Sequence, residues 1–328
     1  MAAAPDTPLT APKVHADPDT PALRVALLGY GEVGRILAED LRAQGVAVSA
    51  CDLKLAASAA VAAPLHAHAE GCGVHLAATH AQAVAGAGLV VSAVTASQTV
   101  PVAQACAGSL APGAFFLDFN SASPGAKIRA AAVVNAAGGR YVEGAVMTTV
   151  PPHRIRVPLL LGGPDAAALE PLLLSLGFAP QLASAQLGVA SATKMCRSIL
   201  IKGLEAMVIE CFTTARHYGV EDAVIASLVE TYPGIDWEHQ GAYLFQRVVE
   251  HGRRRSEEVR EVAETVRDAG LQPFSASGTA ERQAQMADLA DAGVFGSRGT
   301  PGFARSANWR TESDRILAYL KKKAPDGI

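Results

Sequence analysis

The chain has few cysteines and none of them forms a C-x-x-C pair. Its 328 residues include only Cys51, Cys72, Cys106, Cys196 and Cys211. An odd number of scattered thiols argues against a disulfide framework and is typical of a protein in a reducing compartment. We therefore expect a cytoplasmic protein with free thiols.

We also expect no signal peptide and no transmembrane segment. The first 20 residues have neither a basic start nor an apolar run, and their Ala, Pro and Thr content predicts a disordered arm over 1–20. Residues 71–117 contain no Asp, Glu, Lys or Arg, but Gly, Pro and polar residues interrupt each apolar run before it could cross a bilayer. This composition is typical of buried parallel strands, and we expect no contact with a membrane.

Neither sign of charge dominates the chain. The 28 Lys and Arg against 31 Asp and Glu give a formal net charge of −3, which offers no basic surface for nucleic acid. Half of the residues are hydrophobic, enough for a large core, and the length suits two domains. The expected partner is therefore a small molecule.

The most specific motif is a G-x-G-x-x-G that follows an apolar run at 25–28 and precedes a helical pattern. Gly29 permits a tight turn, Gly31 lets the backbone approach a pyrophosphate, and Gly34 lets the helix pack on the strand. The helix N-terminus adds unpaired N–H donors and a positive dipole end. We assign this turn to a dinucleotide, with the residues Gly29, Tyr30, Gly31, Glu32, Val33 and Gly34.

Asp52, at the end of the next expected strand, bears on the choice of cofactor. Its carboxylate suits the ribose hydroxyls of NAD and repels the 2′-phosphate of NADP. Lys54 is a nearby cation that tolerates such a phosphate, so NAD is preferred and NADP stays open. We also place Val94 and Thr95, at the end of a later strand, against the cofactor.

Strand and helix patterns alternate up to residue 187, which predicts an α/β class with an N-terminal Rossmann doubly wound parallel sheet over 21–187. Strands are expected at 89–94, 115–119, 141–146 and 157–161, and helices near 97–108, 124–137 and 165–175.

After residue 188 the pattern becomes helical, which predicts an all-α C-terminal domain over 188–328. Between 189 and 218 only Gly203 interrupts a long helix that is apolar on more than one side, so we expect it to be buried between domains or subunits. This helix favours a homodimer. Further helices are expected near 221–231, 236–250, 253–269 and 277–291.

A polar loop at 118–124 follows one of the buried strands. In a doubly wound sheet that edge faces the ligand, so Asn120 and Ser121 are expected to bind substrate. Ser123, before Pro124, fits the N-cap of the next helix.

The segment 143–149 follows the next strand. Gly144 would let a substrate approach the backbone closely, and Met147 and Thr148 are expected to bind it. An ordinary connection from a strand to a loop explains the segment equally well.

Lys194 lies in the first turns of the long helix, on an otherwise apolar stretch, and Ser198 shares its face one turn later. A lone lysine on such a helix is often a surface residue whose charged end reaches the solvent.

The order of these motifs resembles the β-hydroxyacid dehydrogenases of the 6-phosphogluconate dehydrogenase superfamily, over residues 23–218. That family has a glycine turn, an Asp-x-Ser-Thr-x-Ser-Pro-like loop, a substrate loop and Gly-x-x-x-x-x-Lys, which correspond here to 29–34, 118–124, 143–149 and 188–194. The resemblance implies that Lys194 is the catalytic lysine.

The same resemblance implies that Asn120 and Ser121 touch substrate, and two departures leave the substrate open. Met147, Thr148 and Thr149 replace the family's Ser-Gly-Gly, and Ser198 replaces its Asn.

The second half resembles an uncharacterised subgroup of that superfamily, through Tyr232-Pro233-Gly234, Trp237 and His251-Gly252-Arg253-Arg254. Arg253 and Arg254 suit an anionic substrate, in the same subunit or across a dimer. Alternatively, pairs with Glu257 and Glu258 at i,i+4 would form a solvated helix face.

Together these features predict an NAD(P)-dependent oxidoreductase that acts on a small hydroxy acid or related polar alcohol, with Lys194 as general acid and base. Burial near the nicotinamide is expected to lower the pKa of Lys194. An imine reductase on the same fold and a non-catalytic NAD-binding regulatory protein are the alternatives. No metal is expected, because His66, His68, His75 and His80 lack the spacing of a site.

Overall fold

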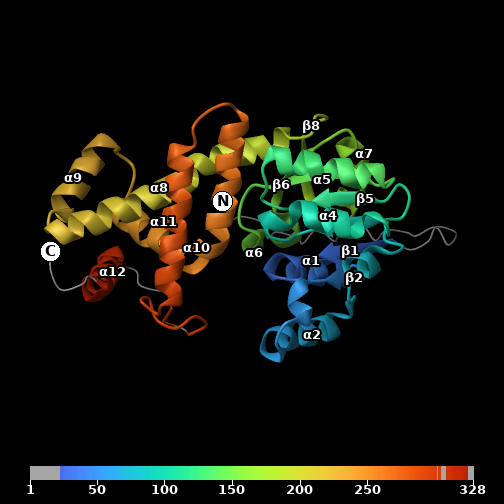
Figure 1. Ribbon diagram of the computed structural model, residues 1–328, viewed down its shortest axis with the longest axis horizontal. Helices are drawn as coiled ribbons and strands as arrows, with labels where there is room; N and C mark the ends of the chain where they lie inside the picture. Colours follow the sequence, from blue (N-terminus) through green and yellow to red (C-terminus); the bar gives the residue numbers. More distant parts are fainter. Residues whose placement is uncertain (1–22, 301, 304–307, 324–328) are drawn as a thin grey trace, which may run out of the picture.

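The computed structural model describes residues 23–300, 302–303 and 308–323, so the arm expected at 1–20 lies outside the described residues. A sheet-containing half lies beside a helical half (Figure 1). The last strand is β8 (Ala179–Ser184), and the long helix α8 (Val189–Tyr218) follows it. The expected division between residues 187 and 188 lies between these two elements. The chain is thus a Rossmann-like α/β domain followed by helices. Within the described ranges, no helix is long and apolar enough to cross a bilayer.

The eight strands form one sheet in the order β3-β2-β1-β4-β5-β6-β7-β8. All neighbours are parallel except β6 and β7, which corrects the expected fully parallel sheet. The connection over 147–157 is too short for a parallel crossover, which needs about a dozen residues or more, so β7 returns antiparallel. The other strands are β1 (Arg24–Leu28), β2 (Ala47–Cys51), β3 (His75–Leu76), β4 (Leu89–Ser92), β5 (Phe115–Asp118), β6 (Arg140–Val146) and β7 (Pro158–Gly162).

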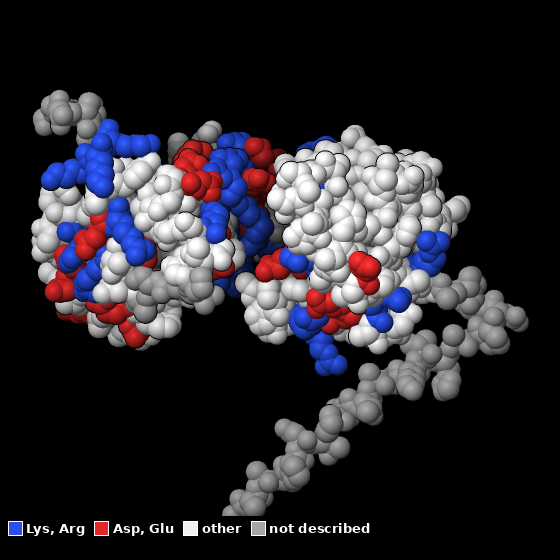
Figure 2. Space-filling model, turned by 90° about the horizontal axis from the view of Figure 1, so that it is seen from below, with Lys and Arg blue, Asp and Glu red and all other residues white. Residues whose placement is uncertain are grey.

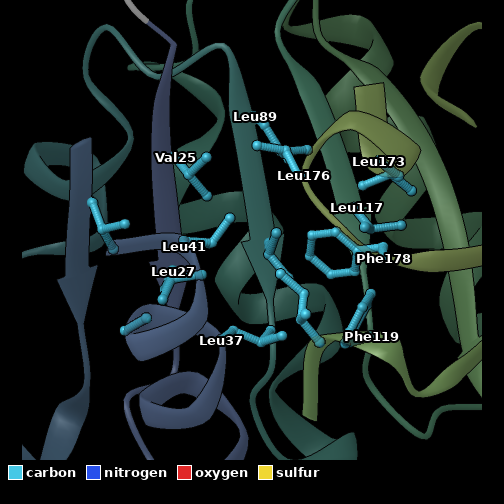
Figure 3. Packing of buried hydrophobic residues seen from close by; sticks show 14 of the residues in the cluster. Val25, Leu27, Leu37, Leu41, Leu89, Leu117, Phe119, Leu173, Leu176 and Phe178 are labelled. Carbon is cyan, nitrogen blue, oxygen red and sulfur yellow. The ribbon is translucent and has the colours of Figure 1, made fainter. Parts of the chain in front are cut away.

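Helices cover both faces of the sheet, which explains why strands in the uncharged segment lack polar alternation. On one face, Leu27 packs with Leu37 and Leu41, while Phe119 meets Phe178 edge to face (Figure 3). The helices of this half are α1 (Glu32–Ala43), α2 (Ala59–Cys72), α3 (His80–Val84), α4 (Thr99–Ala107), α5 (Pro124–Ala136), α6 (Val150–His153) and α7 (Ala166–Ser175), with short 3-10 turns η1 (Leu53–Ala56), η2 (Ala96–Gln98) and η3 (Arg154–Arg156).

The helical half packs around aromatic side chains from three helices. Phe212, Phe245 and Trp309 are each almost fully buried, and the rings of Phe212 and Trp309 lie 4.7 Å apart. The helices after α8 are α9 (Glu221–Thr231), α10 (Trp237–Asp268), α11 (Phe274–Asp291) and α12 (Trp309–Lys323).

The two helices expected at 236–250 and 253–269 are a single helix, α10. The break was expected around Gly252, but this glycine lies inside the helix. A Cβ atom there would be 2.7 Å from the backbone oxygen of Gln283 on α11, so the glycine allows two helices to pack closely. It does not end one of them.

Candidate active site

The glycine turn between β1 and α1 has the shape that a dinucleotide needs. Gly29 has a φ of +92°, and a Cβ atom there would lie 2.5 Å from the oxygen of Ala93. A Cβ atom on Gly34 would lie 2.1 Å from the oxygen of Gly29. At Gly31, by contrast, a Cβ atom would meet no described atom within 4 Å, and Gly31 provides no side-chain cap for α1. The open space and the helix N-terminus fit a pyrophosphate.

Asp52 is held rigidly beside this turn. Its Oδ2 accepts a hydrogen bond of 2.7 Å from the N–H of Tyr30, and its Oδ1 accepts one of 2.8 Å from the N–H of Lys54. Each carboxylate oxygen has a second lone pair, so the ribose hydroxyls of a cofactor can still bind.

Tyr30 turns its side chain into the protein. Its hydroxyl bonds to Nδ1 of His68 at 2.9 Å, and Nε2 of His68 bonds to Glu39 at 2.9 Å. Burial, the largest cause, together with nearby acidic groups raises the pKa of Tyr30 to about 12. The side chain of Tyr30 therefore anchors the turn to α2, and contact of Tyr30 with a cofactor stays a prediction.

Asn120 joins the ends of two neighbouring strands. Its Oδ1 accepts a 2.8 Å hydrogen bond from the N–H of Val94, and its Nδ2 donates to the hydroxyl of Ser92 at 3.0 Å. The side chain is buried, so its visible role is to position the loops. Thr95 follows Val94 and is exposed in front of η2. Contact of Asn120 with substrate and of Val94 and Thr95 with a cofactor stays a prediction.

The fold brings Lys194 and Ser121 together. The Nζ atom of Lys194, on α8, donates a 2.7 Å hydrogen bond to the hydroxyl of Ser121, in the loop after β5. Burial lowers the pKa of Lys194 to about 7, against the opposing charge of Glu258. The cations Lys202, Lys127 and Arg254 contribute to the decrease. An amine with this pKa can both take up and release a proton at neutral pH.

A buried ion pair between the second domain's helices lies close to Lys194. Nζ of Lys202 is 2.6 Å from Oε2 of Glu258, and Arg254 bonds to the other oxygen. Burial acts to raise the pKa of Glu258, but the surrounding cations outweigh it and hold that pKa well below its usual value. Sequence reasoning missed Lys202 and Glu258, because Glu258 looked like a surface partner of Arg254.

The structure separates the two predicted arginines. Arg254 pairs with Glu258, as the i,i+4 alternative expected, yet its charge also reaches Lys194. Arg253 does not pair with Glu257. It binds two carboxylates on α11 instead, Asp288 at 2.6 Å and Asp291 at 2.8 Å.

A second buried lysine holds the start of the loop that carries Ser121. Lys127, on α5, is 1% exposed, forms a 3.0 Å ion pair with Asp118 and donates to the backbone oxygen of that residue at 2.7 Å. The hydroxyl of Tyr141 donates to the other Asp118 oxygen at 2.6 Å. These bonds hold the end of β5, where the loop starts. The sequence signal was a lysine one turn after the loop, in a mostly apolar helix.

Glu143 positions the helix that carries Lys194. Its carboxylate accepts hydrogen bonds from the N–H groups of Gly188 (2.9 Å) and Ala190 (3.0 Å) and from the hydroxyl of Ser191 (2.8 Å). This arrangement caps the N-terminus of α8. Gly144 makes room for core side chains, since a Cβ atom there would meet Leu117, Phe119 and Leu159 at 3.2 Å.

The remaining predicted substrate residues lie at different depths. Met147 is half-buried, with its N–H bonded to the oxygen of Pro158, whereas Thr148 is exposed. Ser198 is buried one turn beyond Lys194. Their contact with substrate stays a prediction.

The second domain directly contacts the loop that follows β5. A carboxylate oxygen of Glu261, on α10, accepts a 2.8 Å hydrogen bond from the N–H of Ser123. The hydroxyl of Ser123 accepts from the N–H of Ala126, which confirms it as the N-cap of α5. Figure 2 shows Lys and Arg side chains gathered where the two halves meet, beside a largely uncharged Rossmann face.

Comparison with known proteins agrees with this architecture. Residues 24–177 match the NAD binding domain of 6-phosphogluconate dehydrogenase, and residues 215–286 match a domain of unknown function. A conserved hypothetical protein from Sinorhizobium meliloti 1021 is 33% identical, with a TM-score of 0.67 over 90% of this chain and 97% of that chain. The chain belongs to the 6-phosphogluconate dehydrogenase-like family.

Two further proteins extend the comparison. An uncharacterized 28.5 kDa protein of Methanothermus fervidus is 24% identical over 255 residues, 77% of this chain and 94% of that protein. The 3-hydroxyisobutyrate dehydrogenase of Mycobacterium tuberculosis shares the fold, with a TM-score of 0.66 at 16% identity over 90% of this chain and 99% of that one. The first half thus matches an NAD-binding domain, and the chain shares its fold with that dehydrogenase.

Proposed function

We propose that the protein is an NAD(P)-dependent dehydrogenase or reductase that acts on a small hydroxy acid or related polar alcohol, with Lys194 as general acid and base. The observation that carries this proposal is the contact of Lys194 with Ser121, together with the pKa of about 7 for that lysine. A solvent-exposed lysine would not have its pKa lowered by burial.

The cofactor residues fit a nicotinamide dinucleotide. The open face of Gly31 and the N-terminus of α1 would hold the pyrophosphate, and Asp52 would bind the adenosine ribose. The bound nicotinamide would accept or supply the hydride. Asp52 favours NAD over NADP, because its negative charge repels a 2′-phosphate.

Lys194 would accept and donate the proton that the reaction transfers. In oxidation, the neutral amine takes the proton of the substrate hydroxyl. The hydride leaves the carbon that bears this hydroxyl, so a C=O bond forms. In reduction, the ammonium returns that proton to the oxygen. The Ser121 hydroxyl accepts a hydrogen bond from Nζ and fixes its position.

The charges around Lys194 support an anionic substrate. Lys202 and Arg254 are two cations that share a single carboxylate, Glu258, which leaves an excess of positive charge beside the catalytic amine. We leave Arg253 out of this site because α11 holds it by two ion pairs.

Loss of Lys194 tests the proposal. We expect Lys194→Ala to lower kcat by about 10²–10⁴-fold with hydroxy acids, sugar acids, sulfonates or diols, because proton transfer is lost. NAD affinity should stay unchanged. Stopped-flow or steady-state assays of NADH formation measure the first quantity, and calorimetric titration measures the second.

Lys321→Ala, on the exposed end of α12, is the matched control and should behave like the wild type. Full activity of Lys194→Ala would refute the role of the lysine. Turnover of imines alone would favour the imine reductase alternative, and tight NAD binding without any turnover would favour the non-catalytic one.

Cofactor preference is tested at Asp52. We expect Asp52→Ala to weaken NAD binding more than NADP binding, because the mutation removes a ribose ligand and also removes repulsion of the phosphate. Titration with both cofactors measures the change. Equal losses for the two cofactors would contradict the ribose role.

A further inference from the structure

The loop over 147–157 connects β6 to β7 and packs against α1. It begins with Met147 and Thr148, the predicted substrate residues at the end of β6. It continues through α6 and η3, and both elements contact α1, as Figure 1 shows for α6. One end of the loop thus carries expected substrate residues, while the other end lies on the helix that follows the glycine turn.

Arg154 holds the far end of this loop on α1. Its Nε donates a 2.9 Å hydrogen bond to Oδ1 of Asp40, and its Nη2 donates one of 2.6 Å to Oε2 of Glu39. The other Asp40 oxygen accepts a 3.0 Å hydrogen bond from the N–H of Ile155, whose side chain is buried in the core. The planar guanidinium can bind both carboxylates at once, which the single ammonium of a lysine does less well.

The backbone of Arg154 has a conformation that its residue type avoids. Its φ is +53°, and no other non-glycine residue in the described parts of the chain has a positive φ. Such a conformation costs free energy and persists only where the surrounding contacts enforce it. A glycine would adopt it at little cost, so the presence of an arginine points to a role for its side chain.

Glu39 also connects the loop to the cofactor turn. Its other oxygen, Oε1, lies 2.9 Å from Nε2 of His68, and Nδ1 of the same ring lies 2.9 Å from the hydroxyl of Tyr30. The N–H of Tyr30 bonds to Asp52, the expected ribose ligand. A continuous His68 network, made of Tyr30, His68, Glu39 and Arg154, therefore starts beside the expected cofactor site and ends in the loop.

The donors and acceptors of the His68 network are matched. The hydrogen bonds from His68 and then from Arg154 lower the pKa of Glu39, so its carboxylate stays an acceptor. With a neutral His68 ring, Nε2 donates to Glu39 and Nδ1 accepts from the hydroxyl of Tyr30. Loss of that hydroxyl would leave Nδ1 without its donor and loosen the ring that holds Glu39.

The ion pair between Arg154 and Glu39 is too exposed to contribute much to folding stability. The side chains are 44% and 39% exposed, and pairs of this kind add little to the free energy of unfolding. Their geometry nevertheless fixes direction, because the guanidinium bonds to two carboxylates. Loss of Arg154 should therefore change the position of the loop more than the stability of the fold.

We propose that Arg154 is a positioning residue, which holds the 147–157 loop for substrate and couples it to the cofactor turn through the His68 network. The proposal rests on the proposed function, because substrate contact of Met147 and Thr148 is part of that function. A bound dinucleotide would restrict the turn and Tyr30, and the network would pass this restriction to Glu39 and Arg154. The loop would then lose mobility before the substrate binds.

Hydrogen exchange of the loop tests this coupling without a substrate. Calorimetric titration first shows whether NAD or NADP binds more tightly, and that cofactor is used at saturation. In the wild type we expect it to slow the exchange of amides 148–156 at least about threefold. Arg154→Met should exchange faster without cofactor and should lose the response to cofactor. Arg156→Met, at an exposed arginine of η3, is the matched control and should respond like the wild type.

Tyr30→Phe tests the other end of the His68 network, because it removes only the hydroxyl. We expect this variant to lose most of the response to cofactor, although residue 30 is far from the loop in sequence. The double variant with Arg154→Met should lose no more than Arg154→Met alone, since both changes break the same network. Circular dichroism checks that each variant is folded.

The outcomes separate this proposal from the proposed function. Cofactor binding without slower loop exchange, or a full response in Arg154→Met, would overturn the coupling and leave the proposed function intact. Effects of Tyr30→Phe and Arg154→Met that simply add would also overturn it. Absence of any NAD or NADP binding to the wild type would refute both.

Steady-state kinetics measures the positioning of the substrate. With a substrate that the wild type oxidises, we expect Arg154→Met to raise KM at least about threefold and to change kcat less than about twofold, because Lys194 and Ser121 stay in place. Arg154→Lys keeps the charge without the fork, so its KM should be intermediate. An unchanged KM in Arg154→Met, or a loss confined to kcat, would contradict the positioning role.

Discussion

The three glycines of the cofactor turn have different physical reasons to lack a side chain. Gly29 and Gly34 make room for atoms of the chain itself, whereas the space before Gly31 contains no described atom within 4 Å of a Cβ position. The sequence motif assigned these roles correctly for the fold. The expected role of Gly31, close approach to a pyrophosphate, concerns only the protein with its cofactor bound.

We therefore expect Gly31→Ala and Gly34→Ala to have opposite phenotypes. Gly31→Ala should change the unfolding free energy by less than about 1 kcal/mol, while an added methyl in the phosphate site weakens NAD at least about tenfold. Gly34→Ala should lower the stability of the free protein by about 1–3 kcal/mol, because its Cβ overlaps the oxygen of Gly29. Denaturation without cofactor and NAD titration separate the two effects, and equal stability losses would contradict the assignment.

The sequence predicted which residues lie near the site, but not the direction in which each side chain points. Lys194 and Ser121 were identified from separate motifs, and the structure joins them at 2.7 Å. Tyr30 and Asn120 lie in the predicted segments, but their side chains turn inward to His68 and to Ser92. A motif locates the backbone, while rotamer and packing decide where a side chain points.

At the scale of elements, α8 was predicted from residue 189 to 218, as the structure has it. Its ends are local features, since Gly188 and Gly219 both have positive φ and flank a long apolar pattern. The same local reasoning wrongly divided α10 at Gly252. A glycine that ends a helix and a glycine that admits a neighbouring helix have the same sequence signal.

Alanine at two helical glycines tests this interpretation. We expect Gly252→Ala to lower stability by about 1–2 kcal/mol, because a 2.7 Å contact with the oxygen of Gln283 outweighs the higher helix propensity of alanine. Gly278→Ala, inside α11, should raise stability by about 0.5–1 kcal/mol, since its Cβ would meet no described atom within 4 Å. Urea denaturation measures both. A stabilised Gly252→Ala would contradict the proposed close packing.

On the scale of the whole molecule, the pKa of Lys194 depends on both domains. Burial lowers that pKa first, with Lys202 from α8, Lys127 from the Rossmann half and Arg254 from α10 acting in the same direction. Glu258 on α10 opposes them. The pKa of the Lys194 amine thus depends on charges that no single segment contains.

Opposite substitutions in the ion pair should move the pH profile in opposite directions. In the proposed mechanism oxidation needs the neutral amine, so we expect kcat/KM of the wild type to rise as pH increases through about 7. Glu258→Gln removes a charge that raises the pKa of Lys194, so the acidic limb should move to lower pH. Lys202→Met removes a charge that lowers this pKa and should move the limb to higher pH.

Initial rates between pH 5 and 10 measure both shifts, with whichever hydroxy acid, sugar acid, sulfonate or diol the wild type oxidises. Glu264→Gln, on the exposed side of α10, is the control and should leave the profile in place. Shifts of the same sign in both variants would contradict this electrostatic assignment.

The sequence by itself determined the cofactor turn, the α/β domain followed by helices, the extent of α8 and the position of Lys194. These features depend on local periodicity, on glycine conformation and on motif order. All three can be recognised from residues that are near each other in the sequence. Tertiary structure alone decided the antiparallel β7, the unbroken α10, and the ionic surroundings of Lys194. Ser121 lies 73 residues from Lys194, and Lys202 lies 56 residues from Glu258. The first contact forms only when the two domains pack together, and the second forms when α8 and α10 pack within the helical half. The burial that lowers the pKa of Lys194 likewise depends on this packing.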